Sequence, residues 1–248
     1  MKKILWGIGV GVLVLIVITV IVVGFFLGPI VKTGMETIGP KIAQVPIKVD
    51  SVGVSALTGS AKIKGLVVGN PEGYKTLQAI SVGLVDVGVN PLSVLSDKIV
   101  VRSVHVEAPK ITLEGSPFGK NNLGQIMDNI NAIAKSGGPT ATNAPAQAGK
   151  KSAKKIEVDD FLITGAKVHV SIGGKEMTLP LPDIHLTDLG KGSDGLTATD
   201  LTRQLLNAIT SATLKAFSSA ATDLGKGAGE GVNKITKGIG GLFKRTTN

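Results

Sequence analysis

The feature that most constrains this chain is an uncharged apolar run close to its N-terminus. From Ile4 to Leu27 the sequence has no charged side chain, and its only hydroxyl residue is Thr19. A helix of this length, rising ~1.5 Å per residue, extends about 36 Å and exceeds a hydrocarbon core of ~30 Å. The run therefore predicts a transmembrane helix over residues 4–27, with Ile4, Leu13, Ile16 and Leu27 as anchor residues.

A retained anchor is favoured over a cleaved signal peptide. The run is longer than the ~7 to 15 apolar residues of a signal peptide, and Gly24 to Pro29 offers no convincing small-residue cleavage site. Lys2 and Lys3 precede the run and only Lys32 follows it closely. The positive-inside rule then places residues 1–3 in the cytoplasm and the rest of the chain beyond a single membrane crossing.

Four glycines in this region have the small-xxx-small spacing through which helices approach one another in lipid. They are Gly7, Gly11, Gly24 and Gly28. Two interpretations stay open, dimerisation through these glycines or no self-association, and the second is favoured because glycine is common in membrane helices.

After the anchor, residues 28–134 alternate apolar and polar side chains with the period of two that is typical of strands with one buried face. Turn residues separate the strands, as at Leu57–Gly59, Gly69–Gly73 and Asn90–Pro91. The alternation shifts phase at Asp50–Ser51 and at Arg102–Ser103, as a β-bulge or a corner would produce. We therefore expect a sheet that curves while one aliphatic side stays inside.

Two helical stretches accompany the strands. From Asn121 the apolar residues recur at helical spacing through Ile133, which predicts an amphipathic helix. Residues 156–224 are expected to contain further strands, a hairpin at Gly173–Gly174 and a long amphipathic helix capped by Thr199 or Asp200. Between the two β regions, residues 135–155 are rich in Gly, Pro, Ala and Lys, which predicts a flexible basic linker.

The net charge of +9 comes from two segments. Residues 135–155 carry five lysines and no acid, and residues 225–248 carry five basic residues against Glu230, giving +5 and +4. The remaining chain is neutral, so we expect no nucleic-acid partner. The Gly-rich tail still has basic and apolar residues near helical spacing, so it is either mobile or a contact with a membrane surface. The candidate contact residues are Lys234, Lys237, Phe243, Lys244 and Arg245.

Motifs for chemistry are missing from the sequence. Cysteine is absent, which excludes disulfides and thiolate sites. His105, His169 and His185 lie in strand-like runs at polar positions, and no HExxH, GxGxxG, GxxxxGK[ST] or GxSxG motif occurs. We expect no enzyme activity, no catalytic residue, no cofactor and no metal.

The order of these segments resembles the AsmA-like family. The resemblance is carried by the anchor, by the segments Ile47–Val54, Gly65–Gly73 and Ile99–Pro109, and by Lys155–Phe161 and Leu179–Leu186 in the second half. It implies an inner-membrane protein of Gram-negative-type bacteria with a periplasmic domain. It also implies a role in outer-membrane assembly or phospholipid transport, with phospholipid and other envelope proteins as partners.

The fold class expected is therefore α+β, mainly β: an N-terminal transmembrane helix, then a curved, taco-like antiparallel sheet with two amphipathic helices. An aliphatic groove on this sheet would suit acyl chains, because burial of each CH₂ contributes ~0.8 kcal/mol without a directional partner. Roughly nine strands ~4.8 Å apart span only about 40 Å, so a shuttle, an adaptor or one part of an assembly is favoured over a complete bridge. The candidate groove residues are Ile47, Val49, Val52, Val54, Ile63, Ile99, Val101, Val104 and Val106.

Two alternatives to the lipid groove stay open. One is a structural or protein-interaction domain, for example a small β-sandwich of the WHy type, to which the Val68–Pro71 element is also similar. The other is an ordinary closed core that leaves no groove. An exposed strip of Val, Ile and Leu on the concave face would favour lipid binding, because large exposed apolar strips are uncommon without a function.

Overall fold

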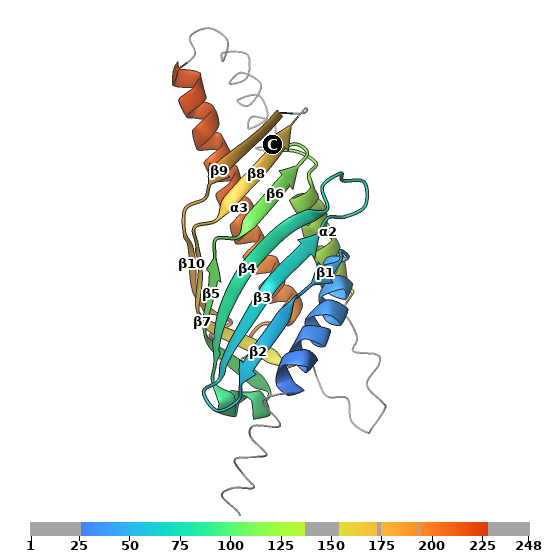
Figure 1. Cartoon of the computed structure of the whole chain (residues 1–248), viewed down its shortest axis with the longest axis vertical. Helices are drawn as coiled ribbons and strands as arrows, with labels where there is room; N and C mark the ends of the chain where they lie inside the picture. Colours follow the sequence, from blue (N-terminus) through green and yellow to red (C-terminus); the bar gives the residue numbers. More distant parts are fainter. Residues whose placement is uncertain (1–25, 137–153, 173–174, 193, 228–248) are drawn as a thin grey trace, which may run out of the picture.

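A computed structural model describes residues 26–136, 154–172, 175–192 and 194–227 (Figure 1). The predicted membrane span therefore lies outside the described residues, except for its last two positions. Within the described ranges, no helix is long and apolar enough to cross a membrane. The basic tail from residue 228 onward and most of the predicted linker also lie outside the described residues.

All the described strands belong to one ten-stranded sheet. Their bounds are β1 Ile47–Lys48, β2 Ser51–Ser55, β3 Ser60–Gly69, β4 Gln78–Val89, β5 Lys98–Glu107, β6 Lys110–Glu114, β7 Lys155–Thr164, β8 Lys167–Ile172, β9 Lys175–Pro180 and β10 Ile184–Leu189. The two β regions that the sequence places on either side of residues 135–155 therefore share a single sheet.

The prediction of a wholly antiparallel sheet is wrong in the middle of the sheet. Strand β5 pairs with β7, and β6 with β8, in parallel. The chain passes from β6 to β7 through helix α2 (Asn122–Lys135), and such a crossover brings the next strand back in the same direction. The predicted hairpin between β8 and β9 is confirmed by their antiparallel pairing.

A line of corners, which we call the corner line, crosses the sheet between its upper and lower halves in Figure 1. Strands β5 and β6, β7 and β8, and β9 and β10 are each one long strand interrupted by two or three residues. The interruptions are hydrogen-bonded to one another: the Ala108 N–H donates to the Thr164 carbonyl, and the Leu181 N–H donates to the Ala166 carbonyl. The sheet therefore bends as one body along this line.

Backbone conformation explains how each strand turns the corner. Gly65, Ala108 and Gly165 have positive φ angles of 62°, 44° and 62°. Each shifts the alternation by one residue, so that aliphatic side chains face inward on both sides of the corner. On β4 the shift falls at Gly83, because Val82 and Val85 are both buried whereas Leu84 between them is only half-buried.

The predicted phase shift at Arg102–Ser103 is confirmed as a second irregularity. The pairing of β4 with β5 changes register between Gly88 and Val89, opposite this pair. In β10 the residue at the same level, Asp188, has a φ of 55°.

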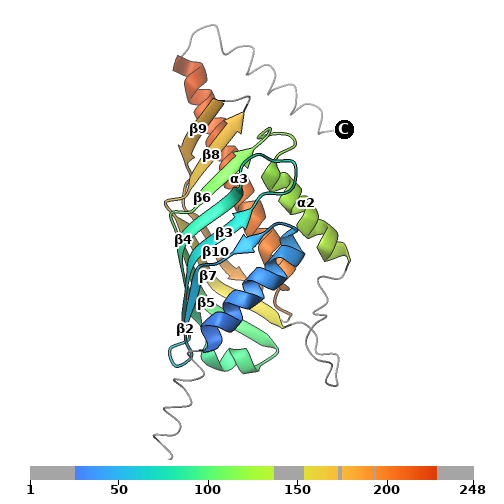
Figure 2. The same cartoon turned by 45° about the vertical axis from the view of Figure 1, so that its right-hand side comes forward.

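Helices cover the concave face of the sheet (Figure 2). The predicted helix α2 is confirmed, with the Asn121 side chain accepting a hydrogen bond from the Gly124 N–H at 2.8 Å as its N-cap. The long helix α3 (Ala198–Gly227) is also confirmed, but its capping side chain is Thr197 and not Thr199 or Asp200. The Thr197 hydroxyl accepts from the Asp200 N–H at 3.0 Å.

The chain is also helical over residues 26–43, a stretch that the sequence patterns did not predict beyond Leu27. Gly28 lets this helix approach β2, because a Cβ at this position would lie 2.1 Å from the Val52 carbonyl oxygen. Gly28 therefore serves a close contact within the chain, between this helix and β2.

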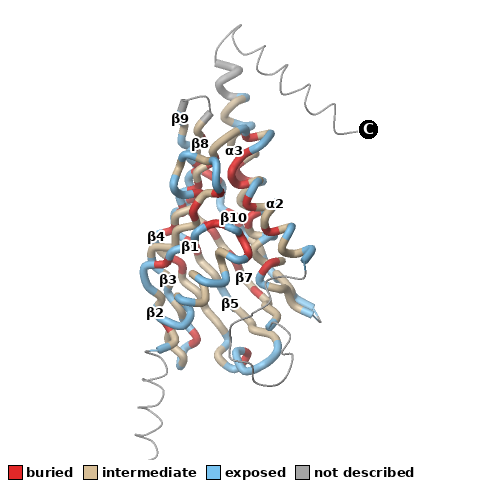
Figure 3. Tube along the Cα trace, turned by 90° about the vertical axis from the view of Figure 1, so that its right-hand side faces the viewer, coloured by how far each residue is buried: buried red, intermediate tan, exposed pale blue. Residues whose placement is uncertain are grey.

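The core lies between the concave face and the two long helices, and buried residues follow α3 and the neighbouring strands in Figure 3. Ile111, Leu123, Ile130 and Val168 are fully buried there. Phe118 packs edge-on against Phe217 of α3, with ring centroids 5.7 Å apart, and joins the start of α2 to α3.

Candidate functional site

An apolar cavity remains between the concave face and the helices. Its volume is about 290 Å³, and it is partly open to solvent. This is roughly twice the ~150 Å³ of an apolar cavity that holds a benzene molecule. The cavity is therefore large enough for a hydrocarbon ligand.

The floor of the cavity is built from transverse rows of aliphatic side chains. Residues paired across neighbouring strands share a face of the sheet. Three rows each cross the whole sheet, with one residue from β1 or β2, one from β3, one from β4, one from β5 or β6, one from β7 or β8, and one from β9 or β10. The rows are Val52, Ile63, Val85, Val106, Ile163 and Ile184; Val54, Ala61, Val87, Val104, Phe161 and Leu186; and Ile47, Val68, Ile80, Ile111, Val168 and Leu179. This regularity explains why a chain with only 3% aromatic residues can build a continuous apolar surface.

The roof comes from the helices. Ile126 and Ile130 of α2, and Leu205 and Ile209 of α3, face the cavity. Thr202, one turn before Leu205–Leu206, supplies the single hydroxyl of the lining. No lining residue is titratable, so the cavity favours binding of apolar groups and offers no acid or base for chemistry.

The structure brings four of the nine predicted groove residues into the cavity wall: Ile47, Ile63, Val104 and Val106. The others do not line the cavity. Val52, Val54, Ile99 and Val101 are half-buried, and their strand pairing places them on the same inner face toward the β2 end of the sheet. The remaining one, Val49, is buried close to the helix of residues 26–43, where its N–H donates to Glu36 Oε1 at 2.9 Å.

Residues that sequence reasoning missed complete the wall. Leu66, Val82 and Pro109 lie on the corner line, where the shift in alternation turns them inward. Their inward direction depends on the positive φ of residues such as Gly65. The glycine at this position was the available signal, because a glycine inside a strand often marks a bulge.

The convex face carries the polar side chains. The predicted placement of all three histidines on strands is confirmed. His169 Nδ1 lies 2.8 Å from the Thr178 hydroxyl, and His185 Nε2 lies 2.5 Å from Asp160 Oδ1. Within the described ranges no group of three His, Asp or Glu side chains could hold a metal ion.

A polar network, also missed from the sequence, attaches α2 to the sheet. The side chain of Asn122 is fully buried, accepts from the Glu114 N–H at 2.9 Å and donates to Asn70 Oδ1 at 2.7 Å. The Glu114 carboxylate accepts from the Lys75 N–H at 2.7 Å and from the Thr76 N–H at 2.9 Å. The network holds one end of the cavity roof in place.

The predicted anchor residues Ile4, Leu13 and Ile16 lie outside the described residues, whereas Leu27 is in the helix of residues 26–43. The tail residues proposed for a membrane surface also lie outside: Lys234, Lys237, Phe243, Lys244 and Arg245.

The fold and cavity define a class of protein in which one curved sheet, covered by helices on its concave side, encloses an aliphatic cavity. Residues 1–187 match the model of the AsmA family. The chain belongs to the AsmA family. The matched range includes the apolar N-terminal run and every strand up to most of β10, and it ends before α3. A search of curated proteins found no match.

Proposed function

We propose that this protein is a membrane-anchored component of the cell envelope that holds an acyl chain of a phospholipid in the cavity between its sheet and helices α2 and α3. The apolar run at residues 4–27 would anchor it in the inner membrane, with the N-terminus inside and the domain in the periplasm. Membership of the AsmA family supports a role in envelope or outer-membrane maintenance.

The observation that carries this proposal is the composition of the cavity wall. Its lining consists of aliphatic residues, Phe161, Pro109 and the single hydroxyl of Thr202. Burial of each CH₂ of a ligand in such a wall contributes ~0.8 kcal/mol. The wall supplies no charged partner for a headgroup, so the headgroup would stay at the opening.

The volume limits what the cavity can hold. Ligand pockets commonly measure ~300 to 1,000 Å³, and this cavity of about 290 Å³ lies at the lower end. It therefore suits part of one acyl chain better than a complete phospholipid. This size favours a local carrier or one part of an assembly over a complete bridge between membranes.

The test is to purify the full chain in mild detergent and examine it by native mass spectrometry, followed by exchange of fluorescent phospholipid between vesicles. We expect a population with the added mass of one phospholipid, and exchange that increases with protein concentration. Only lipid-free protein together with no exchange would contradict the proposal.

A structural or protein-interaction domain without lipid is the second candidate. It is favoured by the coverage of the concave face, since α2 and α3 already bury Leu123, Ile126 and Leu206 against the sheet. The sandwich architecture itself is not what the described strands form, because they make one sheet covered by helices. Lipid-free protein of normal stability would support this candidate.

A further inference from the structure

One end of the molecule exposes large apolar side chains on two turns. Leu57 in the β2–β3 turn is 79% exposed, and Leu92, Val94 and Leu95 of the 3-10 helix η1 (Pro91–Leu95) are 80%, 45% and 88% exposed. We call these four residues the leucine end. Clustered apolar residues on a solvent-exposed protein surface mark a site of interaction with a partner or a membrane.

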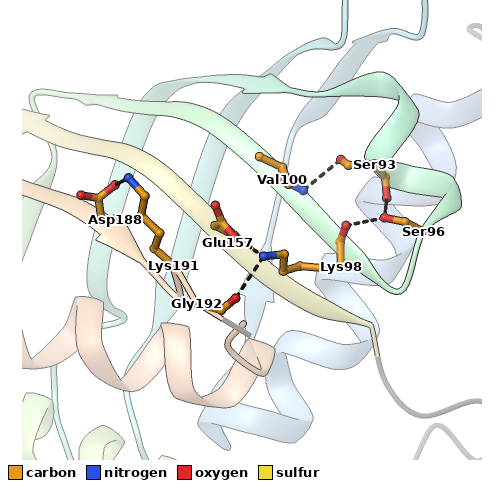
Figure 4. A network of polar contacts seen from close by, with 8 residues as sticks. All are labelled: Ser93, Ser96, Lys98, Val100, Glu157, Asp188, Lys191 and Gly192. Carbon is orange, nitrogen blue, oxygen red and sulfur yellow. Dashed lines mark hydrogen bonds and ion pairs between the residues drawn. The ribbon is translucent and has the colours of Figure 1, made fainter. Parts of the chain in front are cut away.

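The η1 turn is rigidly built. Asn90 Oδ1 accepts from the Leu92 N–H at 3.1 Å. The buried Ser93 hydroxyl accepts from the Val100 N–H at 2.9 Å (Figure 4). Ser96 Oγ lies 2.6 Å from the Lys98 carbonyl oxygen. Since a 3-10 helix has three residues per turn, Leu92 and Leu95 point to the same side. The turn holds both leucines in solvent, although they could have been polar at no cost to its hydrogen bonds.

The β2–β3 turn is fixed beside η1. The Arg102 guanidinium donates to the carbonyl oxygens of Thr58 and Val89, each at 3.1 Å. Gly59 allows the contact, because a Cβ there would lie 2.1 Å from the Val89 carbonyl oxygen. Leu57 is therefore held on the same surface as the two leucines of η1.

The N-terminal anchor sequence reaches the molecule at this same end. The helix of residues 26–43 begins next to β2, where Lys32 Nζ donates to the Asp50 carbonyl at 3.0 Å. Figures 1 and 2 both show the start of this helix beside η1. The uncharged run of residues 4–27 leads directly into it.

A lysine side chain lies beside the leucine end. Lys154 donates from its Nζ to the Val94 carbonyl, and the Lys155 N–H donates to the Asp97 carbonyl at 3.0 Å. Lys154 and Lys155, the last two lysines of the segment 135–155, therefore lie next to η1. An exposed apolar cluster with an adjacent lysine side chain complements a membrane surface that contains anionic lipid.

We propose that the leucine end inserts into the headgroup boundary of the same bilayer that residues 4–27 cross. This inference rests on the membrane anchor of the proposed function. In this orientation an aliphatic face connects the cavity to the bilayer. Half-buried Val54, Val101 and Ile99 lie on the inner face of the sheet between the cavity and the leucine end. An acyl chain could follow this aliphatic face from the bilayer to the cavity.

The test uses the natural lack of cysteine in the full chain. Leu92→Cys and Leu95→Cys are each labelled with an environment-sensitive fluorophore and reconstituted into vesicles of phosphatidylethanolamine and phosphatidylglycerol that carry nitroxide-labelled lipid. The matched control is Leu77→Cys, which is 89% exposed on the β3–β4 connection at the opposite end of the sheet. We expect several-fold stronger quenching at residues 92 and 95 than at residue 77.

Equal, weak quenching at all three positions in protein that floats with the vesicles would overturn the insertion and leave the anchor intact. Protein that fails to float with vesicles would overturn the anchor and the insertion together. In a second variant, Leu92→Ser with Leu95→Ser, a label at Leu57→Cys should lose most of its quenching. Unchanged quenching in that variant would show that the η1 leucines do not seat this end in lipid.

Discussion

At the scale of single residues, Glu114 joins its own strand β6 to the start of α2 and to the β3–β4 connection, which lies far away in the sequence. Its carboxylate binds the β3–β4 connection through Lys75 and Thr76, and its N–H donates to Asn122 at the start of α2. Burial alone would raise the pKa of Glu114, but the hydrogen bonds from Lys75 and Thr76 and the charge of Lys75 hold it below its ordinary 4.5. The ionised carboxylate is therefore the form that the folded protein prefers.

This lowered pKa predicts an acid-sensitive contribution to stability. A group whose pKa is lower in the folded chain stabilises above its unfolded pKa and loses that contribution as the pH falls through the folded value. Glu114→Gln should therefore lower the urea midpoint at pH 7, with a difference from the parent that shrinks as the pH falls below about 4.5. Glu72→Gln, an exposed residue on the same connection, controls for the loss of one negative charge. A difference that is the same at pH 7 and pH 3 would contradict the role of the carboxylate.

At the scale of elements, the corner line is what turns flat strands into a curved floor. Gly165 joins β7 to β8 with a φ of 62°, in a place where a Cβ would meet only Ala108 at 3.8 Å. A side chain would therefore fit in space but would strain the backbone. Left-handed backbone at a residue with a Cβ costs roughly 1 to 2 kcal/mol.

Gly165→Ala should accordingly lower the free energy of unfolding by about 1 kcal/mol. The matched control is Gly83→Ala on the same corner line, where φ is not positive and a Cβ would meet nothing within 4 Å. Urea unfolding of both variants, followed by circular dichroism, measures the difference. If both variants unfold at the same urea concentration, the corner does not depend on the left-handed conformation of Gly165.

At the scale of the whole molecule, local patterns predicted more than long-range ones. Strands, the helix from Asn121 and the shift at Arg102–Ser103 follow from periodicity, because each depends on neighbours in sequence. The parallel pairing of β5 with β7 could not be read this way, since it joins residues on either side of the 135–155 segment. The same limit applies to the cavity.

The sequence predicted an aliphatic face but not what covers it. Four predicted residues line the cavity, while its roof residues Ile130 and Ile209 belong to helices whose apolar stripes were predicted without a packing partner. Leu66 was not among the predicted groove residues, and its place in the cavity wall depends on the conformation of Gly65. Tertiary contacts therefore decide that the groove becomes a partly covered cavity.

The central claim is that the cavity holds lipid, and a substitution that fills it tests this claim most directly. Val85→Phe adds bulk to the cavity wall, whereas Leu84→Phe adds the same ring to the neighbouring residue of β4, which does not line the cavity. Overpacking costs ~1 to 3 kcal/mol, so circular dichroism first confirms that both variants fold.

Native mass spectrometry of the two variants, purified as full chains in the same detergent, then measures the fraction that carries phospholipid. We predict that this fraction falls several-fold for Val85→Phe and stays at the level of the parent for Leu84→Phe. Equal lipid occupancy in both variants, or no lipid in the parent, would contradict the account.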